Sequence, residues 1–153
     1  MAPSKHEIEQ LCSHLGTSDP SPFFDRVSPN VVWDVMGTHP AAGHFETLGM
    51  YSGTSSPPAL LNPKCAESWK QSALGTINKA LREPLSLNVV NVVGGGDEDW
   101  ALVELEANSV CKNGMEYPQR YAWVMRFDKS NTIVQVRAYL DSALVQQAVD
   151  SNS

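Results

Sequence analysis

The chain has 153 residues, of which 42% are hydrophobic and 18% charged, and its formal net charge is −6. A chain of this length is expected to form one domain with a sizeable buried core. Lys and Arg form no run or stripe, so we do not expect nucleic acid as a partner. No apolar run is long enough to span a membrane and no secretory signal opens the chain, so we expect a cytoplasmic protein.

Three cysteines, Cys12, Cys65 and Cys111, are widely spaced and form no Cys-x-x-Cys or Cys/His cluster. This spacing is typical of reduced cysteines that pack as small hydrophobic residues. We therefore expect neither a disulfide framework nor a zinc site, and no metal or cofactor.

The first part of the chain is predicted to be helical. Residues 5–15 form one helix, because Ile8, Leu11, Cys12 and Leu15 recur at helical spacing and Gly16 can end it. A short second helix is expected near Phe23 and Phe24, with Ser18 or Asp19 as its N-cap.

Residues 46–63 are rich in Ser, Pro and Gly and are predicted to form a surface loop. Asn62-Pro63 then marks a helix start, and apolar residues at helical spacing, Trp69 among them, continue to Leu81 before Pro84.

From Leu85 the pattern becomes one of strands separated by turns. The sequence GGGDED joins two strands, Lys112-Asn113-Gly114 predicts a hairpin, and strands follow at residues 119–127 and 133–141. A short helix should end the chain, fraying into a polar tail over residues 146–153. The expected fold is α+β: a curved antiparallel sheet wrapped by N-terminal helices, forming a cone with an apolar pocket.

Alternation along the strands predicts which residues line that pocket, because successive side chains point to opposite faces. The residues expected to contact a hydrophobic ligand are Val32, Met36, Leu105, Ala107, Trp123, Met125, Val136, Ala138 and Leu140.

One acidic residue interrupts the short strand at residues 31–36. Asp34 shares a face with Val32 and Met36, and the other face is also apolar, so its carboxylate is predicted to lie on an apolar wall. Such a carboxylate needs partners, a wet cavity or an unusually high pKa. Two histidines, His39 and His44, follow in a Gly- and Pro-containing turn.

Two stretches resemble the SnoaL-like group, which shares the cone-shaped fold of nuclear transport factor 2, ketosteroid isomerase and limonene epoxide hydrolase. VVWDVMGTHPAAGHF is similar to the pattern W-x-V-P-G-x-H-P-x-A-G-x-Y, with Met36 where Pro is common. NGMEYPQRYAWVMRFDKSNTIVQVRAYLDSALV is similar to the group's C-terminal motif. Fungal single-domain members are the most similar, and the resemblance covers most of residues 5–145.

The resemblance also implies which residues act. Asp34 matches the proton-shuttling Asp of ketosteroid isomerase, an enzyme whose tuned pKa values are well known. The other pocket acid of that enzyme corresponds to Trp123 and its catalytic Tyr to Leu11, so its oxyanion hole is not carried over. Polyketide cyclases carry an acid where this chain has Ala138, so their usual base is missing.

These residues predict proton transfer at carbon, with Asp34 exchanging the proton and Tyr121 or His39 hydrogen-bonding the developing oxyanion. For each residue a structural role stays open: Asp34 bonded to backbone or indole N–H groups, and His39 holding its turn. His44 is expected at the surface, and a metal site formed by Asp34 and the two histidines is a weak hypothesis.

Two classes of function stay open. One is a cofactor-independent isomerase, cyclase or lyase acting on a polyketide- or terpenoid-like molecule. The other is a non-catalytic module that binds a small ligand or a protein. The resemblance also implies a homodimer formed through the sheet.

Overall fold

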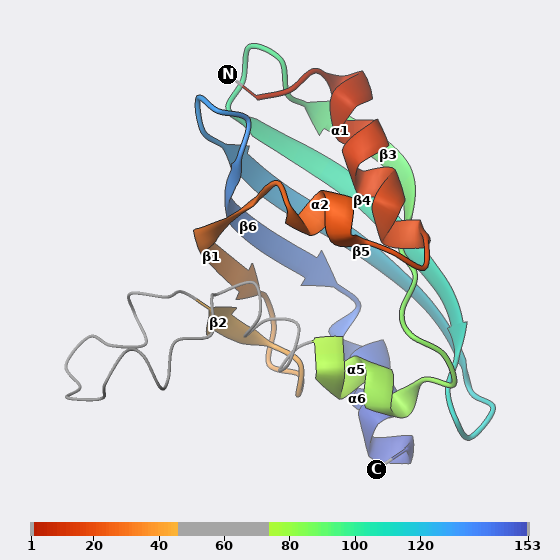
Figure 1. Ribbon diagram of the computed structural model, residues 1–153. Helices are drawn as coiled ribbons and strands as arrows, with labels where there is room; N and C mark the ends of the chain where they lie inside the picture. The colour runs from red at the N-terminus through yellow and green to blue at the C-terminus, as the bar shows by residue number, and fades with distance from the viewer. Residues whose placement is uncertain (1, 46–73, 153) are drawn as a thin grey trace, which may run out of the picture.

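The computed structural model describes residues 2–45 and 74–152 of the chain. The predicted loop at residues 46–63, the helix start at Asn62-Pro63, and residues Cys65 and Trp69 lie outside the described residues. The described part has an α+β fold, with the helices α1 and α2 over one face of a single sheet and α5 and α6 beside one end of it (Figure 1). The predicted fold class is thereby confirmed.

The sheet has six strands in the order β2-β1-β6-β5-β4-β3. Their bounds are β1 Val27–Val35, β2 Gly43–Phe45, β3 Asn88–Gly94, β4 Trp100–Val110, β5 Glu116–Phe127 and β6 Ile133–Leu140. β1 runs parallel to β6, whereas all other neighbours are antiparallel. The prediction of a wholly antiparallel sheet was therefore wrong at this one pair. The last strand, β6, lies beside the first strand, β1, and runs in the same direction.

Both predicted turns between the long strands are confirmed. β3 and β4 are joined through Gly94, Gly95 and Gly96, all of which have positive φ angles, as the run GGGDED indicated. β4 and β5 are joined through Asn113 and Gly114, and the φ angle of Gly114 is 92°. A positive φ is readily adopted only by Gly, so these residues fix the hairpin geometry.

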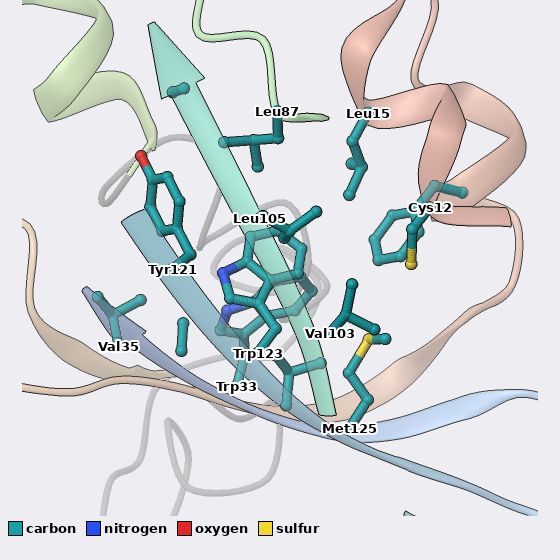
Figure 2. Packing of buried hydrophobic residues seen from close by; sticks show 14 of the residues in the cluster. Cys12, Leu15, Trp33, Val35, Leu87, Val103, Leu105, Tyr121, Trp123 and Met125 are labelled. Carbon is teal, nitrogen blue, oxygen red and sulfur yellow. The ribbon is translucent and has the colours of Figure 1, made fainter. Parts of the chain in front are cut away.

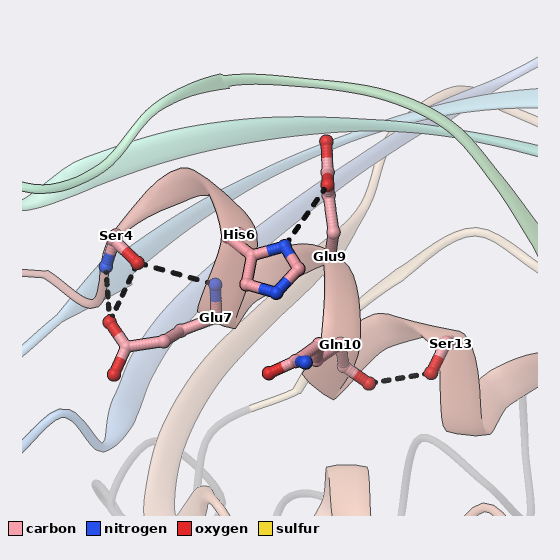
Figure 3. Close-up of polar contacts among 6 residues, drawn as sticks. All are labelled: Ser4, His6, Glu7, Glu9, Gln10 and Ser13. Carbon is pink, nitrogen blue, oxygen red and sulfur yellow. Dashed lines mark hydrogen bonds and ion pairs between the residues drawn. The ribbon is translucent and has the colours of Figure 1, made fainter.

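The helix α1 (Lys5–Ser13) continues into the short 3-10 helix η1 (His14–Gly16), close to the predicted bounds. Its first turn is held by a capping box: Ser4 Oγ accepts the Glu7 N–H at 3.3 Å, and Glu7 Oε2 accepts the Ser4 N–H at 2.8 Å (Figure 3). These bonds lower the pKa of Glu7, because they stabilise its charged form.

The short second helix, α2, spans Ser21–Phe24 and buries Phe23. Its N-cap residue is Pro20 rather than Ser18 or Asp19. Asp19 nevertheless binds the start of this helix, because its Oδ1 accepts the Ser21 N–H at 3.1 Å.

One face of the sheet, here called the inner face, packs against the helices. The predicted apolar faces of β4 and β5 lie there: Val103, Leu105, Trp123 and Met125 are all at most 2% exposed. Trp33 of β1 packs edge-on against Trp123 with ring centroids 5.3 Å apart (Figure 2). The opposite, outer face carries the charged pair Glu106–Arg120.

Two helices close one end of the inner face, α5 (Gly75–Ala80) and α6 (Ser142–Ser151). Asp141 caps α6 by accepting the Leu144 N–H at 3.1 Å. The expectation of a frayed polar tail from residue 146 was wrong. Ala148 is fully buried and Asn152 Oδ1 accepts the Asn113 N–H at 2.9 Å, so the end of α6 is bonded to the β4–β5 turn.

No helix within the described residues is both long enough and apolar enough to cross a membrane.

Candidate functional site

A small apolar cavity lies on the inner face of the sheet, between β1, β5 and β6 and the chain around α5. Its volume is about 40 Å³. Its walls are formed by Val35, Ala41, Leu74, Ile77, Leu85, Leu87, Tyr121, Trp123, Ala138 and Leu140. A single buried water needs roughly 10–15 Å³ on the same measure, so the cavity holds only a few non-hydrogen atoms.

A larger groove adjoins the cavity. It has a volume of about 440 Å³, and Leu74, Leu85 and Leu87 belong to the walls of both spaces. On its other side the groove is lined by η1 and α2, including Leu15 and Phe24. Ligand sites usually measure roughly 300–1,000 Å³, so the groove is large enough for a small molecule.

Three of the predicted pocket residues line the cavity, Trp123, Ala138 and Leu140, together with Tyr121, which was predicted to be catalytic. A further four were placed on the correct face but do not reach it. Leu105, Ala107, Met125 and Val136 are at most 1% exposed and lie within the packed core. Their strands extend past the cavity. The alternation of side chains therefore predicted the correct face of the sheet, but not which residues of each strand lie at the cavity.

The prediction that Asp34, Val32 and Met36 face this cavity was wrong. The buried residues of β1 are Val27, Val31, Trp33 and Val35, with at most 8% exposure. Asp34 and Val32 are only half-buried, and Met36 is exposed. Both faces of this strand are apolar in sequence, so alternation alone did not decide between them. The packing of Trp33 on Trp123 turns Asp34 to the outer face.

On that outer face Asp34 has a partner. Its Oδ1 pairs with Nδ1 of His44, which stands opposite it in the β1–β2 ladder. The side chain of Asp34 is 24% exposed and that of His44 55% exposed. Among residues 2–45 and 74–152, no group of three or more His, Cys, Asp or Glu side chains is arranged to hold a metal ion.

His39 is buried and bonded to its own turn. Its Nε2 lies 3.0 Å from the carbonyl oxygen of Met36, and its Nδ1 accepts the Ala41 N–H at 3.2 Å. Because Nδ1 accepts a hydrogen bond, the proton of the neutral ring must be on Nε2, which donates to Met36. This favours the turn-holding role of His39, which places Ala41 in the cavity wall.

Among the described residues that line the cavity, Tyr121 is the only one with a hydroxyl group. It is 8% exposed, and its ring points the hydroxyl away from the indoles of Trp33 and Trp123 (Figure 2). Burial, and then the neighbouring hydroxyl of Tyr117, raise the pKa of Tyr121 well above its ordinary value. Tyr121 therefore stays protonated at neutral pH and can donate a hydrogen bond.

Tyr117, a fully buried residue four positions earlier on the same face of β5, is the neighbour that adds to the rise in the pKa of Tyr121. Tyr117 in turn accepts a hydrogen bond from Nε2 of Gln119 at 3.2 Å. Gln119 is also fully buried, although it is polar. The three side chains form a row of polar groups between the cavity and the start of α6.

Tyr117 and Gln119 were missed from the sequence because the strand was expected to begin at Gln119, so Tyr117 fell outside it. The sequence does contain a signal for them. Tyr117, Gln119 and Tyr121 are an even number of positions from Trp123 and Met125, so all five side chains lie on the same face of the strand. A Gln on the buried face of a strand must satisfy four hydrogen bonds there, which marks a built polar network.

Comparison with known proteins gives no matching family model, but two curated relatives are similar. The chain is 26% identical over 136 residues to the dimerizing cyclase phiC from a fungal species, strain ATCC 74256, covering 88% of this chain and 52% of phiC. It is 23% identical over 137 residues to the dimerizing cyclase tstC of Talaromyces stipitatus, covering 89% of this chain and 53% of tstC. The chain thus spans about half the length of these relatives.

Solved structures agree over almost the whole chain. A nuclear transport factor 2-like protein from Burkholderia thailandensis superposes with a TM-score of 0.64 at 19% identity, covering 92% of this chain and 95% of that one. A protein from Catenulispora acidiphila with a ketosteroid isomerase-like fold, in complex with trimethylamine, gives a TM-score of 0.62 at 11% identity, covering 96% and 95%.

The chain therefore has the fold of the nuclear transport factor 2 and ketosteroid isomerase class. The resemblance to the SnoaL-like group predicted from the two sequence motifs is confirmed, and the curated relatives are fungal cyclases.

Proposed function

We propose that the protein is a cofactor-independent enzyme of the isomerase or cyclase type, acting on a hydrophobic polyketide- or terpenoid-like molecule. The observation that carries this proposal is the Tyr121 hydroxyl, a protonated donor at the wall of an otherwise apolar cavity. The adjoining groove is large enough for the rest of the substrate.

In this proposal Tyr121 stabilises negative charge that develops on a substrate oxygen when a proton moves at a neighbouring carbon. A hydrogen bond aimed at such an oxygen in a dry site is a strong contribution to catalysis, worth roughly a hundredfold or more in kcat. The names of the curated relatives, which are dimerizing cyclases, support a ring-forming reaction.

The described residues that line the cavity carry no charge at neutral pH. We therefore assign to them only the stabilisation of the negative charge on the substrate oxygen. Asp34 has no part in the proposal because it lies on the outer face, paired with His44. His39 contributes by holding the turn that carries Ala41.

The test compares wild-type protein with Tyr121→Phe during incubation with a lipophilic metabolite extract, followed by mass spectrometry. Tyr139→Phe is the matched control, because Tyr139 is 43% exposed and lies outside the cavity. We expect a new product from wild type and from Tyr139→Phe, and about a hundredfold less from Tyr121→Phe. Equal conversion by all three proteins would remove Tyr121 from the reaction.

A second candidate function is a non-catalytic module that binds a small hydrophobic ligand. Ala138 favours it, because this residue lies in the cavity wall at the position where related cyclases are expected to carry an acid. The same experiment separates the two functions: binding of one compound by wild type and Tyr121→Phe, without conversion by either, would identify a carrier or sensor.

A further inference from the structure

The chain between α5 and β3 forms part of the wall of the groove and is held at both ends by hydrogen bonds. Leu85 N–H donates to Asn78 Oδ1 of α5 at 2.9 Å. Two residues later, Leu87 N–H donates to the carbonyl oxygen of Leu15 in η1 at 3.0 Å. All four residues line the groove. The two bonds therefore fix this wall in place, as is typical of a preformed ligand site.

The bond to Leu85 also settles how the amide of Asn78 is oriented. A backbone N–H is only a donor, so the Asn78 atom that it meets must be the amide oxygen and not the nitrogen. The oxygen is thus used within the protein. What Asn78 offers to a molecule in the groove is its nitrogen Nδ2, which carries two N–H donors. Asn78 is half-buried, so a hydrogen bond made there is partly shielded from water.

The groove also has one charged residue. Among the described residues that line it, Glu83 is the only one with a charged side chain and Asn78 the only one with an amide side chain. Glu83 follows α5 and is exposed. Its carboxylate disfavours a second negative charge beside it, and the net charge of the chain is already −6. The groove is therefore better suited to neutral molecules than to anions.

The rest of the wall is mostly apolar. It consists largely of leucine, phenylalanine and proline side chains, and two of its hydroxyl groups donate to the protein itself. Thr17 Oγ1 donates to the His14 carbonyl at 2.7 Å, and Ser86 Oγ donates to the Gly16 carbonyl at 3.1 Å. A molecule that fits these walls has an apolar body and an oxygen that accepts a hydrogen bond.

We propose that the groove binds a neutral hydrophobic molecule through a carbonyl oxygen, and that Asn78 is the residue that donates to this oxygen. The bond to Leu85 gives the Asn78 amide its orientation, and Glu83 disfavours a carboxylate in the same place. The ligand class is thus a ketone, ester or lactone on an apolar skeleton, not a carboxylic acid. This inference rests on the proposed function for assigning the groove to the substrate, but it concerns binding and is tested without turnover.

The first test compares three probes of similar shape. Acetophenone carries a carbonyl oxygen, α-methylstyrene has a methylene group in its place, and benzoate carries a carboxylate. Their affinities are measured by NMR titration of ¹⁵N-labelled protein, which also reports the side-chain amide signals. Acetophenone should bind about five- to tenfold more tightly than α-methylstyrene, since one hydrogen bond is worth about 1 kcal/mol, and should shift the Asn78 side-chain signal. Equal affinity of these two probes, or an Asn78 signal that does not move, would overturn the proposal.

The second test removes the donor but keeps the wall. In Asn78→Asp the carboxylate still accepts the Leu85 N–H, whereas the two N–H donors of the amide are gone. The preference for acetophenone over α-methylstyrene should fall below about twofold. A purely structural role for Asn78 would weaken both probes equally and leave the preference unchanged, which would contradict the proposal. Asn108→Asp is the matched control and should keep the wild-type preference, because Asn108 is exposed on β4 and does not line the groove.

The third test concerns charge. Glu83→Gln removes the carboxylate and should tighten the binding of benzoate about two- to fivefold, while the affinities for the two neutral probes stay within about twofold. Asp97→Asn removes the same charge from the exposed turn between β3 and β4, outside the groove, and should leave benzoate binding as it is in wild type. An unchanged benzoate affinity in Glu83→Gln would overturn the selectivity against anions.

The fate of this inference is separable from that of the proposed function. A preference for acetophenone that depends on Asn78, without any conversion of the metabolite extract, would retain the binding site and remove the enzymatic role. Conversion that depends on Tyr121, with no preference between acetophenone and α-methylstyrene, would retain the enzymatic role and remove the part assigned to Asn78.

Discussion

Asp34 and His44 stand opposite each other in the β1–β2 ladder, and their side chains pair on the outer face of the sheet. This pairing explains how the structure accommodates Asp34, which the sequence analysis predicted to lie on an apolar wall. Successive side chains of β1 point to opposite faces of the sheet. Because Trp33 packs against Trp123 on the inner face, Asp34 must lie on the outer face, where it pairs with His44.

Asp34→Asn should leave any conversion by this protein within about threefold of wild type, because the cavity lies on the other face of β1. Exposed ion pairs contribute about 0–1 kcal/mol, so the loss of stability should also be small. The measurement is the rate of product formation by mass spectrometry, beside a urea unfolding curve. A loss as large as that expected for Tyr121→Phe would show that Asp34 acts in the reaction.

Gly37 joins β1 to the turn of His39 and should tolerate no side chain. Its φ angle is 115°, and a Cβ atom there would lie 2.6 Å from Ser142 Oγ and 2.9 Å from His39 Cδ2. Gly37→Ala should therefore reduce the free energy of unfolding by about 2 kcal/mol or more, through backbone strain and overpacking together.

The matched control for that substitution is Gly96→Ala. Gly96 also has a positive φ, 66°, but a Cβ atom would meet nothing within 4 Å. Its cost should be backbone strain alone, about 1 kcal/mol. Adding Ser142→Ala to Gly37→Ala should recover part of the loss in urea unfolding; no recovery would show that the contact with Ser142 is unimportant.

Much of the fold could be predicted because the long strands have one polar and one apolar face. The inner residues of β4 and β5, such as Val103 and Trp123, follow directly from alternation. The hairpin at Gly114 follows from turn chemistry. The same reasoning fails at Asp34 because both faces of its strand are apolar, so the choice depends on contacts with distant residues such as Trp123.

The candidate site was only partly predictable for a related reason. Tyr121 was found because it lies among large apolar residues, but Gln119 is polar and was not assigned to the interior. Its burial depends on the backbone of Asp141, 22 residues away, which offers both an N–H and a carbonyl. Local sequence patterns carry no information about such a partner.

Stability should fall at alkaline pH because two buried acids must lose their protons. Burial raises the pKa of Cys12 from 9.0 to about 12, and burial raises that of Tyr121 well above 10.0. From about pH 9 for Cys12 and about pH 10 for Tyr121, the unfolded chain releases these protons while the folded chain still holds them. The free energy of unfolding therefore decreases as pH rises, by up to about 1.4 kcal/mol per pH unit for each group.

Urea unfolding between pH 8 and 11 measures this slope. Tyr121→Phe should make the decline above pH 10 shallower, because it removes one of the two buried protons. The Cys12 thiol should also resist alkylation by iodoacetamide at pH 8 in the folded protein and react after unfolding. Rapid alkylation of Cys12 in the folded protein would contradict its burial.

The outer face of the sheet is where we expect two copies of the chain to meet. It carries the exposed apolar residues Val93 and Tyr139, which are 55% and 43% exposed. Arg137, two residues before Tyr139 on β6, stacks over the ring of Trp100 at 4.9 Å. Aromatic residues and Arg on a flat, partly apolar surface are characteristic of interface centres.

The wild-type protein should therefore sediment as a homodimer at micromolar concentration, and Tyr139→Asp should shift it to the monomer because a carboxylate would be buried without a partner. Gln10→Asp adds the same charge on α1, away from the sheet, and should leave the dimer intact. A monomeric wild-type protein would remove this interface. A dimer that survives Tyr139→Asp unchanged would place the contact elsewhere on the molecule.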